Sequence, residues 1–251
     1  MAELRLNKAL ASAGVCSRRK ADELIQAGAV AVNGLTVTEL GMRITPGSDH
    51  VTVNGRAVAM SPETRDYEYV MLHKPVQVVS TAHDPEGRTT VLELLPTPLR
   101  KKRLYPVGRL DYFSEGLLLL TDDGELTNRL THPRHHLPKV YEVTVRERPG
   151  KDALDRMRRG MTLKEGETLA PAQITVLPDS PHTFLMTLHQ GVNRQIRRMC
   201  RDLGLTILCL HRIQMGPVRL GDLPKGQCRP LLPQELAALK QAAGLMPGNK
   251  K

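Results

Sequence analysis

The stretch from Tyr105 to Gly124, read as YPVGRLDYFSEGLLLLTDDG, constrains the fold more than any other part of the chain. An alternating segment, Val107 to Leu110, leads to Asp111, and Gly116 then opens an uninterrupted apolar run, Leu117 to Leu120. A short apolar run between turn signals is typical of a buried strand. The pattern therefore predicts that Asp111 lies on a turn at the mouth of a buried strand, where a carboxylate would be held rigidly.

The residues alone leave two interpretations of Asp111. An Asp beside Tyr-Phe-Ser-Glu-Gly commonly bonds its own backbone in a turn, and structural roles of this kind outnumber functional sites. A carboxylate fixed at the end of a buried strand also suits a nucleophile. The stretch taken by itself favours the turn role.

The size and charge of the chain indicate what it binds. Its 251 residues suffice for one large domain or two unequal ones, and 40% hydrophobic residues can supply a core. Lys and Arg number 36 against 26 Asp and Glu, so the net charge is +10, which favours nucleic acid as the partner. Two Phe, five Tyr and no Trp argue against a broad platform for stacking bases, so recognition must depend on charge and shape, with at most a few rings.

Several other classes of protein and site are excluded by pattern. No apolar run approaches membrane-spanning length, and charges interrupt the N-terminal segment, so a cytoplasmic protein without a signal or a span is expected. The four cysteines lack C-x-x-C spacing, and His132, His135 and His136 have no acidic or thiol ligand at matching spacing, so no metal site is predicted. Asp122 and Asp123 precede a helix, which predicts turn and N-cap roles rather than a catalytic pair.

Residues 1–60 are predicted to form two short helices followed by small hairpins. Apolar residues recur at helical spacing from Leu4 to Ala13, and Ser17 is a good N-cap for a second helix that runs to Gly28. The pairs Asn33-Gly34 and Asn54-Gly55 are typical of hairpin turns. These elements indicate one compact unit.

The first turn of the second helix breaks a local rule. Arg18, Arg19 and Lys20 carry the wrong charge for the positive end of a helix dipole. Three cations beside free backbone N–H groups would form a phosphate cradle. A solvated charged face explains the same residues equally well, so both interpretations stay open.

The polar segment 61–66 is predicted to be a linker, followed by a larger domain at 67–246 and a basic tail at 247–251. The larger domain is expected to contain the following strands and helices: strands at 69–72, 139–145, 172–177, 183–188 and 205–213, a resumed extended segment at 76–79, and helices at 125–130, 152–159 and 233–245.

A further helix is predicted within HQGVNRQIRRMCRDLG. Its apolar residues recur at i, i+3, i+4 and i+7, and its arginines repeat the same spacing on a roughly opposite face: Arg194, Arg197, Arg198 and Arg201. A solvated face usually mixes Lys and Glu. Four guanidiniums suit bidentate recognition of phosphate or carboxylate instead.

The N-terminal stretch RLNKALASAGVCSRRKADELIQAGAVAVNG resembles the S4 RNA-binding domain. The resemblance implies a small αL-type domain whose helix-turn-helix face binds structured RNA. The residues that it assigns to RNA binding are Arg5, Asn7, Lys8, Ser17, Arg18, Arg19 and Lys20. Ala29 stands where this family often has a basic residue, so one contact is expected to be missing.

The remainder resembles the RsuA/RluB family of RNA pseudouridine synthases. GRLDYFSEGLLLLTDDGEL matches its first signature, Lys139-Val140-Tyr141 matches its K-x-Y element, and NRQIRRM matches its third motif. The resemblance implies an α+β catalytic domain with a mainly antiparallel mixed sheet flanked by helices. It also implies that Asp111 is catalytic, that Tyr141 stacks on the target uracil, and that Arg197 contacts Asp111.

Further RNA contacts are assigned to Lys74, Arg109, Arg194 and Arg198, whereas Val192 replaces a basic residue that the family commonly has. The expected reaction is the isomerisation of uridine to pseudouridine in ribosomal RNA without cofactor or metal, by a monomer acting on rRNA or a pre-ribosomal particle. Within the family the chain most resembles the large-subunit branch, and the small-subunit branch is close. A non-catalytic ribosome-assembly factor that binds rRNA is the rival interpretation, and a nucleic-acid-binding metalloenzyme lacks ligands.

Overall fold

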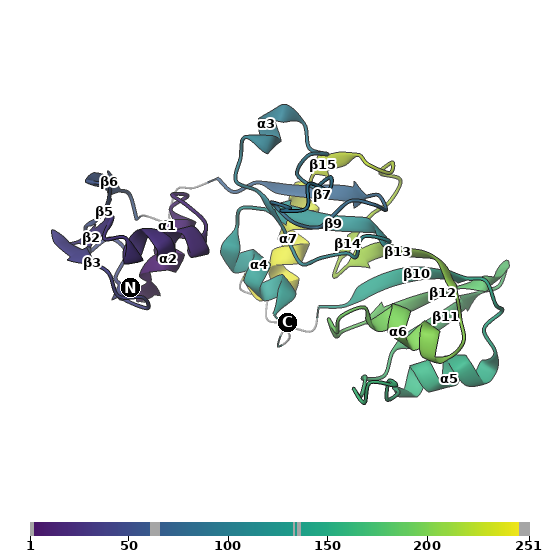
Figure 1. The fold of residues 1–251 in the computed structure, drawn as a ribbon. Coiled ribbons are helices and arrows are strands. Elements are labelled where there is room, and N and C mark those ends of the chain that lie inside the picture. The colour runs from purple at the N-terminus through teal and green to yellow at the C-terminus, as the bar shows by residue number, and fades with distance from the viewer. Residues whose placement is uncertain (1–2, 61–65, 133, 135–136, 246–251) are drawn as a thin grey trace, which may run out of the picture. The chain divides into compact units, whose positions relative to one another are not determined.

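The structure is a computed structural model that describes residues 3–60, 66–132, 134 and 137–245 (Figure 1). The chain divides into two compact units, residues 1–67 and 68–251. All but the last residue of the predicted linker 61–66 lies outside the described residues, as do His135, His136 and the predicted tail 247–251.

The N-terminal unit combines two helices with a small antiparallel sheet. Its elements are β1 (Leu4–Arg5), α1 (Leu6–Ser12), α2 (Arg18–Gln26), β2 (Val30–Val32), β3 (Leu35–Val37), β4 (Arg43–Ile44), β5 (Val51–Val53) and β6 (Arg56–Val58). The strands run in the order β3-β2-β5-β6, and β1 pairs separately with β4. Apolar residues of both helices and of the sheet form one core cluster. The backbone N–H of Lys20 donates to Ser17 Oγ at 3.1 Å, which confirms the predicted N-cap.

The second unit is built on one nine-stranded mixed sheet. Its elements are β7 (Tyr69–Lys74), α3 (Thr97–Arg100), β8 (Tyr105–Pro106), β9 (Glu115–Thr121), α4 (Gly124–Thr131), β10 (Lys139–Val145), α5 (Lys151–Arg159), β11 (Gln173–Leu177), β12 (Ser180–Leu188), α6 (Gln195–Asp202), β13 (Ile207–Met215), β14 (Val218–Arg219), β15 (Cys228–Pro230) and α7 (Pro233–Ala242). The main strand order is β11-β12-β10-β13-β9-β7-β15, with β8 paired to β9 and β14 to β13. This arrangement confirms the predicted α+β class.

Strand β9 is buried on both faces of the sheet, which explains its run of four leucines. Leu117 and Leu119 belong to the core cluster that contains residues of α4 and α7. Leu118 and Leu120 belong to a different cluster, which contains residues of the segment 78–110. A third cluster lies between α5, α6 and the strands β10, β11 and β12. The buried strand predicted after Asp111 is therefore confirmed.

Gly116 allows β13 to approach β9 closely. Its φ is +110°, and a Cβ added there would lie 2.3 Å from the backbone oxygen of Arg212. The two residues are also partners in the parallel pairing of β9 with β13. Glycine is the residue that tolerates this backbone conformation and this contact. The close approach places Arg212 beside the loop that carries Asp111.

Two details differ from or refine the sequence-based expectations. The segment after Lys74 does not resume a strand, because Gln77 has a φ of +63° and only Val79 forms a bridge, with Thr90. Asp123 is the N-cap of α4, accepting from the backbone N–H groups of Glu125 and Leu126. The prediction that Asp123 has a structural role is confirmed.

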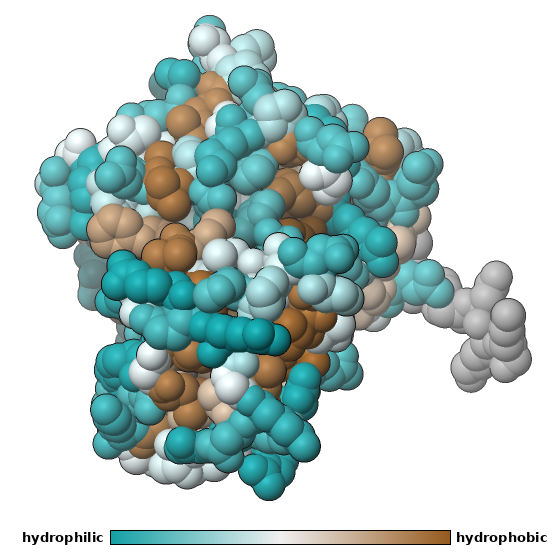
Figure 2. Space-filling view, turned by 90° about the vertical axis from the view of Figure 1, so that its right-hand side faces the viewer, coloured by the Kyte–Doolittle hydropathy of each residue, from teal (hydrophilic) through white to brown (hydrophobic). Residues whose placement is uncertain are grey.

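The surface agrees with the polar composition. On the face drawn in Figure 2, apolar side chains lie between hydrophilic ones. None of the helices in the described residues combines the length and the apolar character that crossing a membrane requires.

Candidate active site

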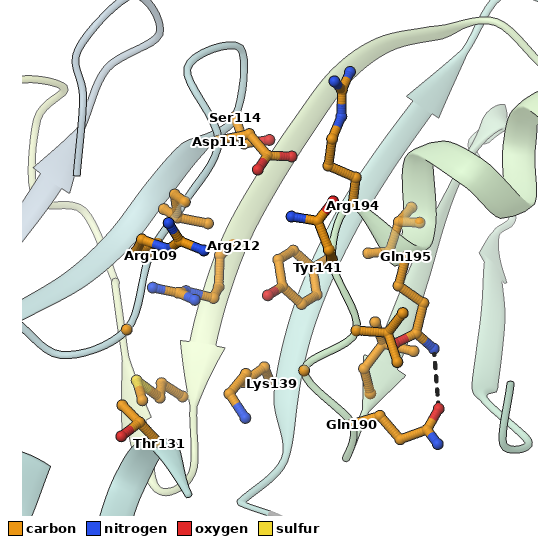
Figure 3. A pocket seen from close by; sticks show the side chains of 18 of the residues that line it. Arg109, Asp111, Ser114, Thr131, Lys139, Tyr141, Gln190, Arg194, Gln195 and Arg212 are labelled. Carbon is orange, nitrogen blue, oxygen red and sulfur yellow. Dashed lines mark hydrogen bonds between the residues drawn. The ribbon is translucent and has the colours of Figure 1, made fainter. Parts of the chain in front are cut away.

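A cavity of about 550 Å³ lies between the loop at Asp111, the strands β10 and β13, and the start of α6 (Figure 3). This volume is typical of small-molecule sites, and it is large enough for one nucleoside. Asp111 is the only carboxylate among the described residues that line it. Five lysine or arginine residues line the same cavity: Arg109, Lys139, Arg194, Arg197 and Arg212. The cavity is therefore suited to an anionic ligand, and it contains a single carboxylate that can act on that ligand.

The loop that presents Asp111 is held by its backbone carbonyls. Each carbonyl from residue 110 to residue 114 accepts a hydrogen bond within the protein. The donors are Ser80 Oγ to Leu110, Lys74 Nζ to Asp111 and Ser114, the Gln77 N–H to Tyr112, and Arg197 Nη2 to Phe113. Because these groups are fixed before substrate arrives, the loop is a preorganised support for a carboxylate.

Lys74 is one of these supports, although the sequence predicted that it contacts the RNA backbone. Its side chain is fully buried. Its Nζ donates to the carbonyls of Pro75 at 2.9 Å, Asp111 at 3.2 Å and Ser114 at 2.8 Å. An ammonium has three N–H groups, so none remains for a phosphate. The predicted RNA contact of Lys74 is wrong, because the residue points into the protein and positions the loop.

Activity should fall as the pH rises through about 8. Burial lowers the pKa of Lys74 from 10.5 to about 8, against the opposing effect of the Asp111 and Glu115 carboxylates. Deprotonation then removes one of the three N–H donors. Between pH 8 and 10.5 the unfolded state binds more protons at this lysine than the folded state, so its contribution to stability rises with pH.

Single-turnover rates and melting temperatures measured across this pH range check the prediction. We expect the rate to decline while the melting temperature does not follow it. A rate that stays constant, or one that falls together with the melting temperature, would contradict the assignment.

Arg197 approaches Asp111 from α6, as the sequence predicted. Its Nε lies 3.7 Å from Asp111 Oδ2, an ion-pair distance rather than a hydrogen bond. Its Nη2 donates to the Phe113 carbonyl at 2.6 Å and to Ser114 Oγ at 3.1 Å. Burial lowers the pKa of Arg197, and the Asp111 carboxylate acts in the opposite direction. Arg197 thus holds the loop by its backbone and carries a charge beside the carboxylate.

Tyr141 projects from β10 into the cavity and is half-buried there. Figure 3 shows Asp111 at one end of the cavity and Lys139 at the other, with Tyr141 and Arg212 between them. Asp111, Tyr141 and Arg197, which are far apart in the sequence, therefore line one cavity. A planar base placed beside the tyrosine ring would lie within the same space as the carboxylate.

The four arginines of the predicted RNA-facing helix divide into two pairs. Arg194 and Arg197 line the cavity. Arg198 donates to Glu167 at 2.7 Å and to Glu165 at 3.3 Å, and Arg201 pairs with Glu165 and Asp202. The guanidinium of Arg198 is therefore occupied by carboxylates of this chain. Two carboxylates of this chain compete with phosphate for this side chain, and the RNA contact of Arg198 stays a prediction.

The candidate RNA-binding residues of the N-terminal unit are mostly exposed. The exposed side chains are Arg5, Lys8, Ser17, Arg18, Arg19 and Lys20, of which Lys20 pairs with Glu23 at 2.7 Å. Asn7 differs, because its Nδ2 donates to Asp22 Oδ1 at 2.8 Å and its Oδ1 is buried. The amide of Asn7 therefore joins α1 to α2, and its RNA contact stays a prediction.

Sequence reasoning missed the inner part of the cavity. Arg212, Lys139 and Gln195 line it, and none of them was assigned a role there. Arg212 is 2% exposed and its Nε donates to the Leu117 carbonyl at 2.8 Å. The sequence did contain a signal for Arg212. This residue follows Leu210 by two positions in a predicted strand, so a charged side chain falls on the same face as a buried leucine. Within the described residues no group of three His, Cys, Asp or Glu side chains is arranged to hold a metal ion.

The site combines a rigid carboxylate, an aromatic ring and a cationic cavity, and the chain also carries an exposed basic helix N-terminus. This combination is typical of an RNA-modifying enzyme. A model of the RNA pseudouridylate synthase family matches residues 68–202, and a model of the S4 domain matches residues 4–50. The chain belongs to the RNA pseudouridine synthase family, and it is accordingly an isomerase.

Curated relatives extend this similarity over nearly the whole chain. The ribosomal large subunit pseudouridine synthase B of Bacillus subtilis is 43% identical, covering 95% of this chain and 96% of the relative. The protein of the same name from Pseudomonas aeruginosa is 36% identical, covering 97% of this chain and 63% of the relative. A crystal structure of a pseudouridylate synthase, 31% identical, superposes with a TM-score of 0.68 and covers 94% of this chain and 99% of that one.

Proposed function

We propose that this chain converts a specific uridine of large-subunit ribosomal RNA to pseudouridine. The observation that carries the proposal is the cavity whose described lining contains one carboxylate, Asp111, together with five cationic side chains and the Tyr141 ring. The names of the relatives from Bacillus subtilis and Pseudomonas aeruginosa support the large subunit as the target. The enzyme acts as a cytoplasmic monomer without cofactor, on rRNA or a pre-ribosomal particle.

In this proposal each residue has a separate role. The uridine leaves its stack, at a cost of a few kcal/mol, and its base stacks on Tyr141. Asp111 attacks or stabilises the sugar as the glycosidic bond breaks, while Arg197 keeps the carboxylate and its loop in place. Arg109 and Arg194, both exposed at the cavity, contact the phosphates around the extruded nucleotide.

Mapping of pseudouridine in ribosomal RNA tests the proposal. RNA is compared between cells that lack this gene and the same cells supplied with the wild-type chain or with the Asp111→Asn chain. We expect one large-subunit position to lose pseudouridine and to regain it only with the active chain. Loss at a small-subunit position would contradict the target, and an unchanged map would favour the non-catalytic assembly factor.

Reversing the charge at the start of α2 should weaken RNA binding without slowing the chemistry. Arg18 and Arg19 are exposed, and neither has an ion pair among the described residues. We expect Arg18→Glu with Arg19→Glu to lower affinity for the target RNA at least about tenfold, and to reduce the salt dependence by roughly one unit of slope per lost phosphate contact. The single-turnover rate at saturating RNA should stay unchanged.

Binding titrations at several salt concentrations check this expectation. Arg43→Glu with Arg56→Glu is the matched control, because it changes the net charge equally at exposed positions outside α2. Equal weakening by both double variants would mean that only the overall charge matters, and would contradict a specific role for α2.

A further inference from the structure

Arg212 carries a buried positive charge that the fold does not neutralise. It lies on the central strand β13 and is 2% exposed. Its Nε donates to the Leu117 carbonyl, but its Nη2 is buried and has no hydrogen-bond partner among the described residues. Burying a donor of a charged group without a partner is costly, so a purely structural arginine would be expected to have its donors satisfied.

The residues around Arg212 add positive charge rather than balance it. Among the described residues Arg212 has no ion pair, and the single carboxylate of the cavity, Asp111, lies beside Arg197. The nearby Lys139 is half-buried, and within the described residues its Nζ donates to the Leu137 carbonyl alone. Burial lowers the pKa of Lys139, and the charge of Arg212 lowers it further. Two cations are therefore held together at the inner end of an open cavity.

The sheet places both cations beside the ring that receives the base. Tyr141 and Arg212 are direct cross-strand partners in the pairing of β10 with β13, so their side chains share one face of the sheet. Lys139 precedes Tyr141 by two residues and lies on that same face. All three side chains line the cavity (Figure 3). A uracil stacked on Tyr141 would thus have its edge within the reach of cationic donors.

Uridine isomerisation generates an anion at this place. When the N1–C1′ bond breaks, its electron pair stays with the uracil and spreads over N1, O2 and O4. When C5 bonds to C1′, the ring returns that pair, after which C5 loses its proton and N1 gains one. The negative charge on the ring exists only between these two events, and fixed donors accelerate a reaction when they bind charge that develops along it.

We propose that Arg212 is a catalytic residue that donates a hydrogen bond to a uracil oxygen while the detached ring is anionic, with Lys139 as the second cation. This inference rests on the proposed function. It explains why the inner end of the cavity is cationic although no phosphate needs to reach it, and why a guanidinium donor is left without a partner in the folded chain.

The test compares two substrates whose leaving rings differ in acidity. A short transcript containing the uridine located by the rRNA mapping is prepared with uridine or with 5-fluorouridine at that position. Fluorine stabilises the anionic ring by itself, so it reduces the need for a donor. We expect Arg212→Met to lower the single-turnover rate on uridine about 10²-fold, the effect of removing one such donor. On 5-fluorouridine, followed by chromatographic loss of the starting nucleoside, the reduction should be at least about threefold smaller.

Two further variants separate catalysis from folding. Arg212→Lys keeps the charge and should recover part of the rate. Arg219→Met removes an exposed arginine on the adjoining strand β14, outside the cavity, and should leave the rate unchanged. Affinity for the transcript should be the same for all three variants.

The possible outcomes are distinct. An equal loss on both substrates, or a loss that follows a fall in melting temperature, assigns Arg212 to the fold and overturns the inference. Wild-type activity of Arg212→Met overturns it as well, while leaving the proposed function in place. A wild-type chain that makes no pseudouridine contradicts the proposed function itself, and the inference with it.

Discussion

Replacing Asp111 by Asn should abolish pseudouridine formation and leave RNA binding intact. The expected loss in single-turnover rate is at least about 10⁴-fold, the size seen when a residue of a catalytic nucleophilic unit is removed. No other carboxylate lines the cavity in the part of the chain that the structure describes, so no neighbouring carboxylate there can take over its role. An amide is neutral and is a poor nucleophile, whichever of the two roles the carboxylate plays.

The same substitution should scarcely change the fold. The loop is held through its backbone carbonyls by Lys74, Gln77, Ser80 and Arg197, and Asn leaves these bonds in place. The carboxylate itself contributes only the contact at 3.7 Å with Arg197 and is about two-fifths exposed. The unfolding free energy should therefore change by less than about 1 kcal/mol, the range typical of exposed ion pairs.

A rate measurement on the target transcript, paired with a binding titration and a melting curve, checks this result. Asp222→Asn is the matched control, because Asp222 is exposed and does not line the cavity. Turnover by Asp111→Asn within about tenfold of wild type would remove Asp111 from the chemistry. A parallel loss of RNA affinity would show that the carboxylate acts in binding instead.

The sequence predicted those features that depend on neighbours along the chain. The buried strand after Gly116 followed from a run of four leucines, and the structure confirms it with leucines packed on both faces of β9. The N-cap roles of Ser17 and Asp123 followed from their places before helices. Local patterns of this kind are reliable because the groups that satisfy them lie within a few residues.

The sequence did not predict the partners of polar side chains that are distant along the chain. Lys74 bonds to carbonyls 37 and 40 residues away, Arg198 to carboxylates 31 and 33 residues away, and Asn7 to Asp22. Each appears in the sequence as a free polar group near an expected RNA face. Only the folded chain shows these partners, and the pairing of β10 with β13 likewise places Arg212 beside Tyr141.

Replacing Lys74 by Met should destabilise the synthase unit and slow catalysis together. Met has a similar length and is apolar, so the buried site remains filled. The carbonyls of Pro75 and Ser114 lose the Lys74 donor, whereas that of Asp111 keeps the Ser114 N–H. Leaving the buried carbonyl of Ser114 and the part-buried carbonyl of Pro75 unsatisfied costs roughly 2–4 kcal/mol, which corresponds to a melting temperature about 5–10 °C lower.

The loss of rate should exceed what reduced stability alone explains. Without Lys74 the loop keeps Ser80, Gln77 and Arg197 but loses its tie at both Asp111 and Ser114. A displacement of the carboxylate by about 1 Å is enough to lower the rate about 10²-fold. We therefore expect at least this reduction at a temperature where the variant is fully folded.

RNA affinity distinguishes this role from the phosphate contact that the sequence suggested. If Lys74 holds the loop, Lys74→Met should bind the transcript as tightly as wild type, with the same dependence on salt. If it contacts RNA, affinity should fall and the salt slope should shrink by about one unit, while the melting temperature stays constant. Lys151→Met, which removes an exposed lysine at the start of α5, is the control for the loss of one charge. Because Lys74 is fully buried and all three of its N–H groups are used, the first outcome is expected.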